Sequence, residues 1–147
     1  MSNRKFEFVQ GDEKTVAPGV VVKRIRALVA ISATLFSPAV SAGDLGGYVQ
    51  YESNIDASGN AWVYGNAQVY GNAHVSGNAW VYGNAQVYGD AWVSGNARVY
   101  GDAWVYGNAQ VYGDAWVYGN AREYGNAYVL GNARVSGNAY VSGTASE

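Results

Sequence analysis

The side chains best suited to chemistry in this chain are few, and they stand far apart in a repeated sequence. His74 is the single histidine, and there is no cysteine. A three-histidine zinc site within one chain is therefore excluded, as are thiolate chemistry and disulfides. A trimer could bring three copies of His74 together, but the corresponding neighbours Ser76 and Trp92 would not orient the rings. We interpret His74 as a solvated surface imidazole.

Glu123 is the one residue that breaks the apolar pattern of its position. The equivalent places 18 residues before and 18 residues after it hold Val105 and Val141. A carboxylate among valines is expected to have a raised pKa and to be costly unless it is paired. One interpretation is a lone catalytic acid. We prefer a tolerated defect near the C-terminal end, with the coil bulged so that the carboxylate reaches water or Arg122, because one unpaired carboxylate does little chemistry.

Three aspartates, Asp90, Asp102 and Asp114, occupy places that otherwise hold asparagine. Aligned aspartates can bind calcium. These three fall on different corners of successive coils, so no carboxylate is expected to stack directly on another. We therefore predict that they cap corners and hold no metal.

All of these residues stand within a six-residue word, Gly-(Asn/Asp)-Ala-x-Val-(Tyr/Ser), which recurs without insertion from Gly59 to Ser142. Side chains alternate along each word, so Ala and Val point one way and the x and Tyr/Ser residues the other. Gly adopts positive φ freely, and Asn tolerates it better than most residues, which predicts a corner after each strand. Three words, about 18 residues, then close one triangular coil, and coils stack at about 4.8 Å.

Other folds fit the repeat less well. Gly at every sixth position would cost a helix roughly 1 kcal/mol each, and the aromatic content is atypical of disorder. Because right-handed β-helices have longer and less uniform coils, we predict an all-β fold, a left-handed parallel β-helix. Residues 59–147 are expected to form about 4–5 coils. Residues 1–58 are predicted to be an irregular N-terminal capping region of strands or a short helix.

The run Val63-Tyr64-Gly65-Asn66-Ala67-Gln68 resembles the hexapeptide motif of left-handed β-helix proteins. The resemblance covers residues 59–145, and it departs from the family where Tyr or Ser, in place of Gly, follows the aliphatic residue. Residues 24–28 and 43–49, leading into GNAWVYG, look like a group of uncharacterised phage and prophage proteins with the same GNAxVY repeats. The first resemblance implies a scaffold whose enzymes are acyltransferases or zinc-dependent carbonic anhydrases, and it favours a trimer.

Enzymes of that family rely on histidine, and its acyltransferases carry loops that interrupt the coils to shape a substrate cleft. The present chain has one histidine and an uninterrupted repeat. We therefore expect no enzymatic activity, no metal and no cofactor. A hexapeptide-repeat acyltransferase-like enzyme is kept as an alternative.

Sorting the outward residues by coil places them on three faces. Aromatic ladders can simply stabilise stacked strands, but a large aromatic area is rarely left unpaired on a soluble protein. Trp, Tyr and Arg are also enriched at binding hot spots. One face combines these residue types and is the candidate binding surface: Trp62, Tyr64, Trp80, Tyr82, Arg98, Tyr100, Trp116 and Tyr118. It predicts self-association, with a trimer favoured, or binding of another protein. Carbohydrate stacking on the Trp rings is a second option.

The charge and hydropathy of the chain bound its partners. The formal net charge of −2 gives no field that would recruit nucleic acid or a membrane surface. No apolar run approaches the roughly 20 residues that span a bilayer. The segment from Lys23 to Ala42 imitates a secretion signal, although we prefer to assign it to the cap. We expect a location in the host cytoplasm or the virion, or secretion if that segment is a signal.

The sequence thus predicts a non-catalytic structural or protein-interaction module of phage origin that acts through aromatic outer faces. A carbohydrate-binding protein, a virion tip protein and a host-defence antagonist stay open as alternatives. The residues themselves do not separate these alternatives.

Overall fold

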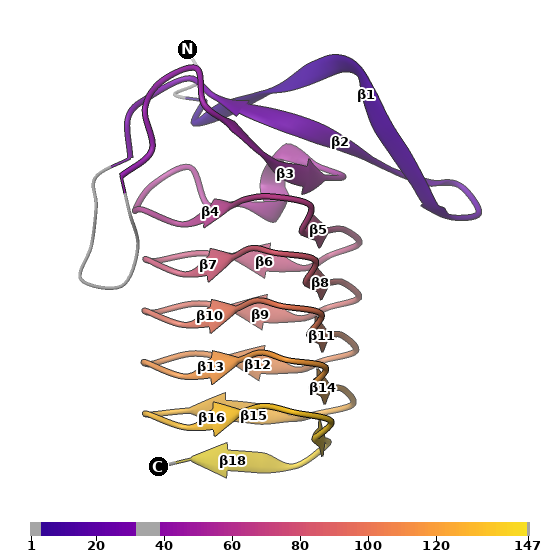
Figure 1. Ribbon diagram of the computed structural model, residues 1–147, viewed down its shortest axis with the longest axis vertical. Helices are drawn as coiled ribbons and strands as arrows, with labels where there is room; N and C mark the ends of the chain where they lie inside the picture. Colours follow the sequence, from indigo (N-terminus) through magenta and orange to yellow (C-terminus); the bar gives the residue numbers. More distant parts are fainter. Residues whose placement is uncertain (1–3, 32–38, 147) are drawn as a thin grey trace.

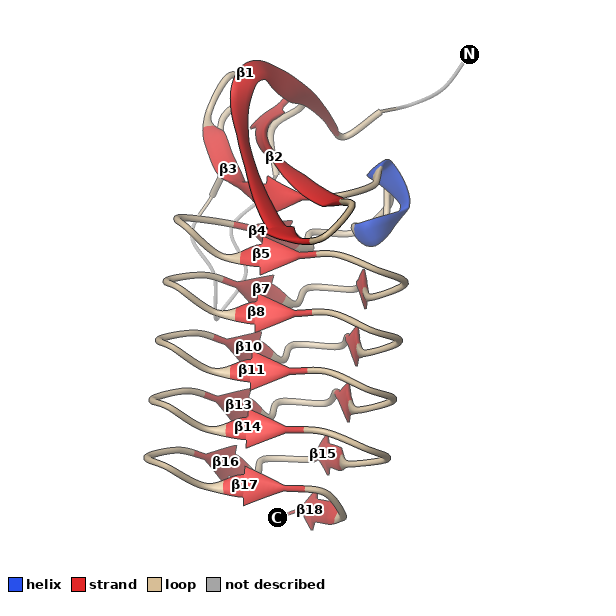
Figure 2. Ribbon diagram, turned by 90° about the vertical axis from the view of Figure 1, so that its right-hand side faces the viewer, coloured by secondary structure: helices blue, strands red, loops and turns tan. Residues whose placement is uncertain are grey.

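The computed structural model describes residues 4–31 and 39–146 of the chain. The repeats form a column of stacked triangular coils beneath a cap of longer N-terminal strands (Figure 1). Figures 1 and 2 together show that the chain winds left-handed from the cap toward the C-terminus. The predicted all-β solenoid is therefore confirmed.

Two kinds of strand make up the fold. The N-terminal strands are long, whereas nearly every repeat contributes a strand of two residues. The elements are β1 (Phe6–Ala17), β2 (Val20–Ala27), β3 (Leu45–Val49), the 3-10 helix η1 (Glu52–Asn54), β4 (Trp62–Val63), β5 (Gln68–Val69), β6 (His74–Val75), β7 (Trp80–Val81), β8 (Gln86–Val87), β9 (Trp92–Val93), β10 (Arg98–Val99), β11 (Trp104–Val105), β12 (Gln110–Val111), β13 (Trp116–Val117), β14 (Arg122–Glu123), β15 (Tyr128–Leu130), β16 (Arg134–Val135), β17 (Tyr140–Val141) and β18 (Thr144–Ser146).

The strands form three sheets, one on each side of the triangular column. Sheet A has eight strands in the order β1-β2-β3-β5-β8-β11-β14-β17. Sheet B has five, β16-β13-β10-β7-β4, and sheet C has five, β18-β15-β12-β9-β6. All pairs between coils are parallel, and from β4 to β17 each x residue stands on the x residue of the next coil, as Trp62 does on Trp80. At the C-terminal end, Tyr128 of β15 stands on Thr144 of β18. The predicted sorting of outward residues into three faces is confirmed.

Backbone hydrogen bonds between coils hold the column together. In the first repeat, the N–H groups of Trp62, Tyr64 and Asn66 donate to carbonyl oxygens of the next coil at 3.2, 2.8 and 3.0 Å. The bonds therefore continue beyond the two residues of each strand into the corner. The ladder is unbroken although each repeat strand spans only two or three residues. The inward Ala and Val side chains fill the interior and are almost all fully buried.

The corners differ in one respect from expectation. Within residues 4–31 and 39–146, only glycines have positive φ, so the corner asparagines do not use the left-handed region. Their side chains instead form ladders between coils. Asn78 Nδ2 donates to Asn96 Oδ1 at 3.1 Å, and Asn96 Nδ2 donates to Asp114 Oδ1 at 2.9 Å. The corner aspartates accept hydrogen bonds from asparagine side chains of the preceding coil, which supports their predicted role as corner caps.

A glycine at a closely stacked corner should not tolerate even one methyl group. Gly95 has a φ of 67°, and a Cβ there would lie 2.8 Å from the backbone nitrogen of Gly113. We expect Gly95→Ala to lower the free energy of unfolding by about 2–4 kcal/mol, from backbone strain and from overpacking. Gly125 has a φ of 61° but nothing within 4 Å of the added Cβ. Gly125→Ala should therefore lose only about 1–2 kcal/mol. Urea denaturation measures both, and equal losses would show that stacking at the corner adds nothing.

The N-terminal strands cover the first coil. β3 pairs antiparallel with β2 and parallel with β5, so the parallel ladder already begins before the first repeat word at residue 59. The Lys5 ammonium donates to the carbonyl oxygen of Ala61 at 2.8 Å. Gly46 lets β3 approach closely, because a Cβ there would lie 2.7 Å from the Trp62 ring. These contacts hold the long strands of the N-terminal region against the first coil.

Part of the segment that imitates a secretion signal is an ordered part of this cap. Its basic residues lie in β2, and the Arg24 guanidinium donates to the carbonyl oxygens of Gly46 and Gly65 at 2.9 and 3.1 Å. The apolar stretch that follows falls partly on residues 32–38, which lie outside the described residues. No helix in the described part of the chain is long and apolar enough to cross a membrane.

Candidate interaction surfaces

The outer face of sheet B carries the predicted binding residues, and the rings nearest the cap are buried. Trp62 is 0% exposed and Trp80 only 7% exposed. The Phe6 ring meets Trp62 edge-on at 6.4 Å, and Tyr64 stacks on Trp80 at 6.0 Å. The expectation that both Trp rings lie on the surface is therefore wrong, because Phe6 of β1 covers Trp62 and Tyr64 stacks on Trp80. Trp62 belongs to the core.

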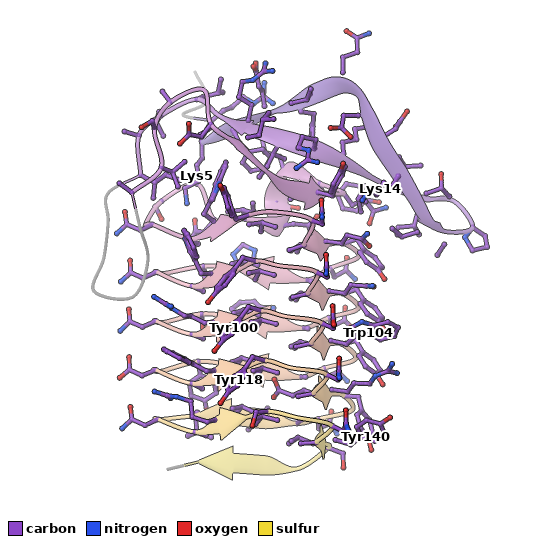
Figure 3. All side chains as sticks on the ribbon, viewed as in Figure 1. Lys5, Lys14, Tyr100, Trp104, Tyr118 and Tyr140 are labelled. Atoms are coloured by element: carbon purple, nitrogen blue, oxygen red, sulfur yellow. The ribbon has the colours of Figure 1, made fainter. Side chains whose placement is uncertain are left out.

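Tyr64 is 49% exposed, and farther from the cap this face carries a strip that we call the sheet B strip: Arg98, Tyr100, Trp116, Tyr118 and Arg134. The Tyr100 and Tyr118 rings stack at 5.0 Å with 4° between their planes, and Tyr82 continues the column at 4.8 Å from Tyr100. Figure 3 shows Tyr100 and Tyr118 one above the other. The Arg98 and Arg134 guanidinium groups lie over the Trp116 ring at 5.2 and 4.4 Å. Burial raises the pKa of the Tyr100 hydroxyl, which keeps it a hydrogen-bond donor.

Sheet A carries a second tyrosine column on its outer face. The Tyr88 ring stacks on Tyr70 at 4.9 Å and on Tyr106 at 5.1 Å. Burial raises the pKa of Tyr88 to about 12. Beside the column, the Arg122 guanidinium covers the Trp104 ring at 4.1 Å. These rings mainly contact one another and Arg122, as in an aromatic ladder that stabilises stacked strands.

Sheet C presents its aromatic rings more openly. Trp92 is 50% exposed and Tyr128 is 41% exposed. His74, in the same column, is half-buried, and its Nδ1 lies 2.8 Å from the carbonyl oxygen of Ser53. His74 is therefore a partly exposed surface imidazole, and one hydrogen bond that we did not expect holds its ring. The sequence repeat could not reveal this contact, because Ser53 lies in η1, outside the repeat.

Glu123 occupies the interior position that the sequence indicates. It pairs with Val105 on one side and Val141 on the other, and its side chain is 0% exposed. Neither carboxyl oxygen has a hydrogen-bond partner among the described residues. The expected bulge toward water or Arg122 is wrong, because the ladder bonds continue through β14 and hold its backbone in register. Burial raises the pKa of Glu123 to about 8.

The charged and ligating groups do not gather at one place. Within the two described segments, no three His, Asp or Glu side chains form a group that could hold a metal ion. His74 lies on sheet C, while Glu123 lies inside the column on sheet A. The three corner aspartates accept hydrogen bonds from Asn72, Asn84 and Asn96 of the preceding coil.

Comparison with known families agrees with this geometry. Residues 67–83, 92–107 and 109–125 match a family model described as the YdcK Beta solenoid repeat. The chain is a repeat β-solenoid. The matched stretches lie within the coils from β5 to β14 and make up about a third of the chain. No curated protein matches the solenoid. Its closeness to phage and prophage proteins stays a prediction.

Proposed function

We propose that the protein is a non-catalytic scaffold that binds protein through the sheet B strip, in the first place further copies of itself. The observation that carries this proposal is the Trp116 ring held between Arg98 and Arg134 beside a stacked tyrosine column. Trp, Tyr and Arg are the residue types that dominate binding hot spots. A trimer, favoured by the hexapeptide family, would bury three such strips against one another.

The rigidity of the strip supports this role. Its residues project from parallel strands that are bonded to both neighbouring coils, as β13 is to β10 and β16. The stacked rings of Tyr100 and Tyr118 have already lost most of their rotamer freedom in the free protein. Binding therefore orders few side chains, which reduces the entropic cost of association. The arginines supply donors at the strip's edge for carbonyl or carboxylate groups of a partner.

The absence of catalysis is also part of the proposal. The buried Glu123 and the held His74 lie on different sheets, so they offer no acid–base pair to one substrate. The coils between β4 and β17 carry no loop long enough to shape a cleft. The outer faces of the solenoid therefore fit a surface for recognition better than a reaction site.

Assembly through the sheet B strip predicts a clear change in mass. We expect the wild-type chain of 15.6 kDa to elute as an oligomer in size-exclusion chromatography with light scattering. The double variant Trp116→Ser and Arg134→Ser should lower the measured mass toward the monomer, and affinity should fall about 100-fold or more, as for paired hot-spot residues. Trp92→Ser, an exposed tryptophan on sheet C, is the matched control and should leave the mass unchanged.

Two results would contradict self-association through the sheet B strip. One is a wild-type chain that stays monomeric at the highest concentration reached. The other is loss of assembly by Trp92→Ser with no effect of the sheet B variant, which would move the interface to sheet C. Retention of the far-ultraviolet β spectrum in both variants shows that the coils are intact.

The sequence resemblance to phage and prophage proteins supports a phage setting for this scaffold. The genes beside its own test this part of the proposal. Tail genes would indicate a virion component, whereas small anti-defence genes would indicate a host target. A neighbourhood of ordinary bacterial metabolic genes would contradict a phage origin.

A further inference from the structure

Sheet C differs from the other faces in what stands beside its aromatic rings. In sheets A and B the residue after the inward Val is mostly Tyr, and that ring packs edge-on against the tryptophan, as Tyr106 does on Trp104 at 6.4 Å and Tyr118 on Trp116 at 6.5 Å. In sheet C the residue beside Trp92 is Ser94. Beside this small side chain Trp92 is 50% exposed, and on the cap side its ring lies 5.3 Å from the His74 ring.

The x residues of this sheet stack in one column, which we call the sheet C strip: His74, Trp92, Gln110 and Tyr128. The strand register places Gln110 directly between Trp92 and Tyr128. The two aromatic residues are therefore two coils apart, about 10 Å at the usual strand spacing. An amide that can both donate and accept stands between them. Trp92 and Tyr128 thus offer two aromatic surfaces for stacking, with the Gln110 amide between them.

A shallow hollow adjoins the cap-side end of the sheet C strip. It is lined by Tyr51, Ser53, Asn54, Gly71, Asn72, Ala73, His74 and Trp92. Tyr51 is exposed at its edge, so two aromatic rings border one hollow. With Nδ1 of His74 assigned as the donor to the Ser53 carbonyl oxygen, Nε2 is left as an acceptor on the outer side of the ring. The hollow thus combines apolar ring faces with fixed polar groups, as small-ligand sites do.

The charge of this face restricts the ligand. The outward residues of sheet C from β6 to β15 carry no Asp, Glu, Lys or Arg: His74, Ser76, Trp92, Ser94, Gln110, Tyr112, Tyr128 and Leu130. An acidic polymer such as a nucleic acid or a sulfated glycan would find no cation here. A neutral polymer with apolar faces and many hydroxyl groups would match both the rings and the amide.

We infer that the sheet C strip binds a neutral polysaccharide that lies along the coils, with sugar rings stacked on Trp92 and Tyr128. The C–H groups on the flat side of a pyranose ring carry partial positive charge and face the negative ring face. Gln110, between the two rings, and Ser94, beside Trp92 on the same coil, meet the sugar hydroxyls. The hollow beside Tyr51 holds the next sugar toward the cap. This site is independent of the sheet B strip, so either proposal can fail alone.

Isothermal titration calorimetry with two uncharged β-linked probes, cellohexaose and chitohexaose, tests the site. We expect saturable binding of at least one hexasaccharide. The corresponding disaccharide should bind at least about tenfold more weakly, because it reaches only one ring. Trp92→Ala and Tyr128→Ala should each weaken hexasaccharide binding about tenfold, as for loss of one anchoring ring. Trp104→Ala, whose ring lies under Arg122 on sheet A, is the matched control and should bind as the wild type does.

Three outcomes would overturn the proposal. The first is that neither hexasaccharide binds the wild-type chain at millimolar concentration. The second is equal weakening by Trp104→Ala, which would place the sugar elsewhere. The third is binding of the acidic polymer heparin in place of both neutral probes. A cooperative unfolding transition of each variant in urea excludes misfolding as the cause of lost binding, and unchanged mass in light scattering separates this result from the assembly proposal.

Discussion

Replacing Glu123 with valine is expected to stabilise the protein by about 5 kcal/mol or more at pH 8. The variant should also lose most of the decrease in stability that the wild-type protein shows between about pH 4.5 and pH 8. The carboxyl group lies in a column of valines, fully buried and without a hydrogen-bond partner among the described residues. Burial raises its pKa from 4.5 to about 8. Because one pKa unit corresponds to about 1.36 kcal/mol, the loss across this window is about 5 kcal/mol.

The sign of the effect follows from where the proton is bound. Between about pH 4.5 and pH 8 the folded chain keeps the Glu123 proton, whereas the unfolded chain has released it. Raising the pH therefore favours the unfolded state throughout this window, and the contribution levels off above about pH 8. Valine at position 123 carries no proton in either state, so the contribution disappears. At pH 4 the gain should shrink to about 1–3 kcal/mol, the cost of one unsatisfied polar group.

Urea denaturation of wild type and variant at pH 4, 6 and 8.5 measures this difference. The comparison cancels the titration of groups elsewhere in the chain. Glu123→Gln is the matched control: it should remove the pH dependence but gain little at pH 4, because its buried amide is as unpaired as the neutral carboxyl group. Parallel pH profiles for wild type and Glu123→Val would show that the carboxyl group is ionised or hydrated in the folded protein.

The second large effect is expected from Trp62→Ala, which should cost about 3–5 kcal/mol. Trp62 is the largest fully buried side chain, enclosed by Phe6 of β1 and by the close approach of Gly46 in β3. Its removal leaves a cavity at the junction between the cap and the first coil. Two elements far apart in sequence share this ring, so the cavity weakens the attachment of the whole cap.

Trp104→Ala provides the comparison, because its half-exposed ring should cost only about 1 kcal/mol on truncation. Guanidinium denaturation measures both changes. Limited proteolysis should also cut the Trp62→Ala variant faster between β1 and β2, where the detached hairpin becomes accessible. Similar losses for the two variants, or unchanged proteolysis, would contradict the assignment of Trp62 to the core.

The predictability of each site residue depended on how far away its neighbours lie in sequence. The stacking of Trp92, Gln110 and Tyr128 followed from the repeat, once three six-residue words are taken to close one coil. The burial of Trp62 did not follow, because Phe6 and Gly46 lie outside the repeat. The hydrogen bond of His74 to Ser53 was missed for the same reason.

Glu123 lies between these cases. Its inward position and its raised pKa followed from the valines at the corresponding places in the neighbouring coils. Whether the backbone would bulge did not follow from the pattern, because two free energies compete there. Burying one carboxyl group is costly, but a bulge would break ladder bonds to the coils on both sides, such as those that Tyr106 and Tyr124 donate. The structure retains the ladder.

The sequence by itself determined the solenoid. Alternation decided that Ala and Val point inward, and glycine at every sixth place decided where the chain turns, since both effects act within one word. Only the tertiary structure decided which outward rings reach solvent. Exposure depends on side chains from other coils and from the cap: Phe6 over Trp62, Arg122 over Trp104, and the small Ser94 beside Trp92. The chemistry of the surface is therefore set by these long-range neighbours.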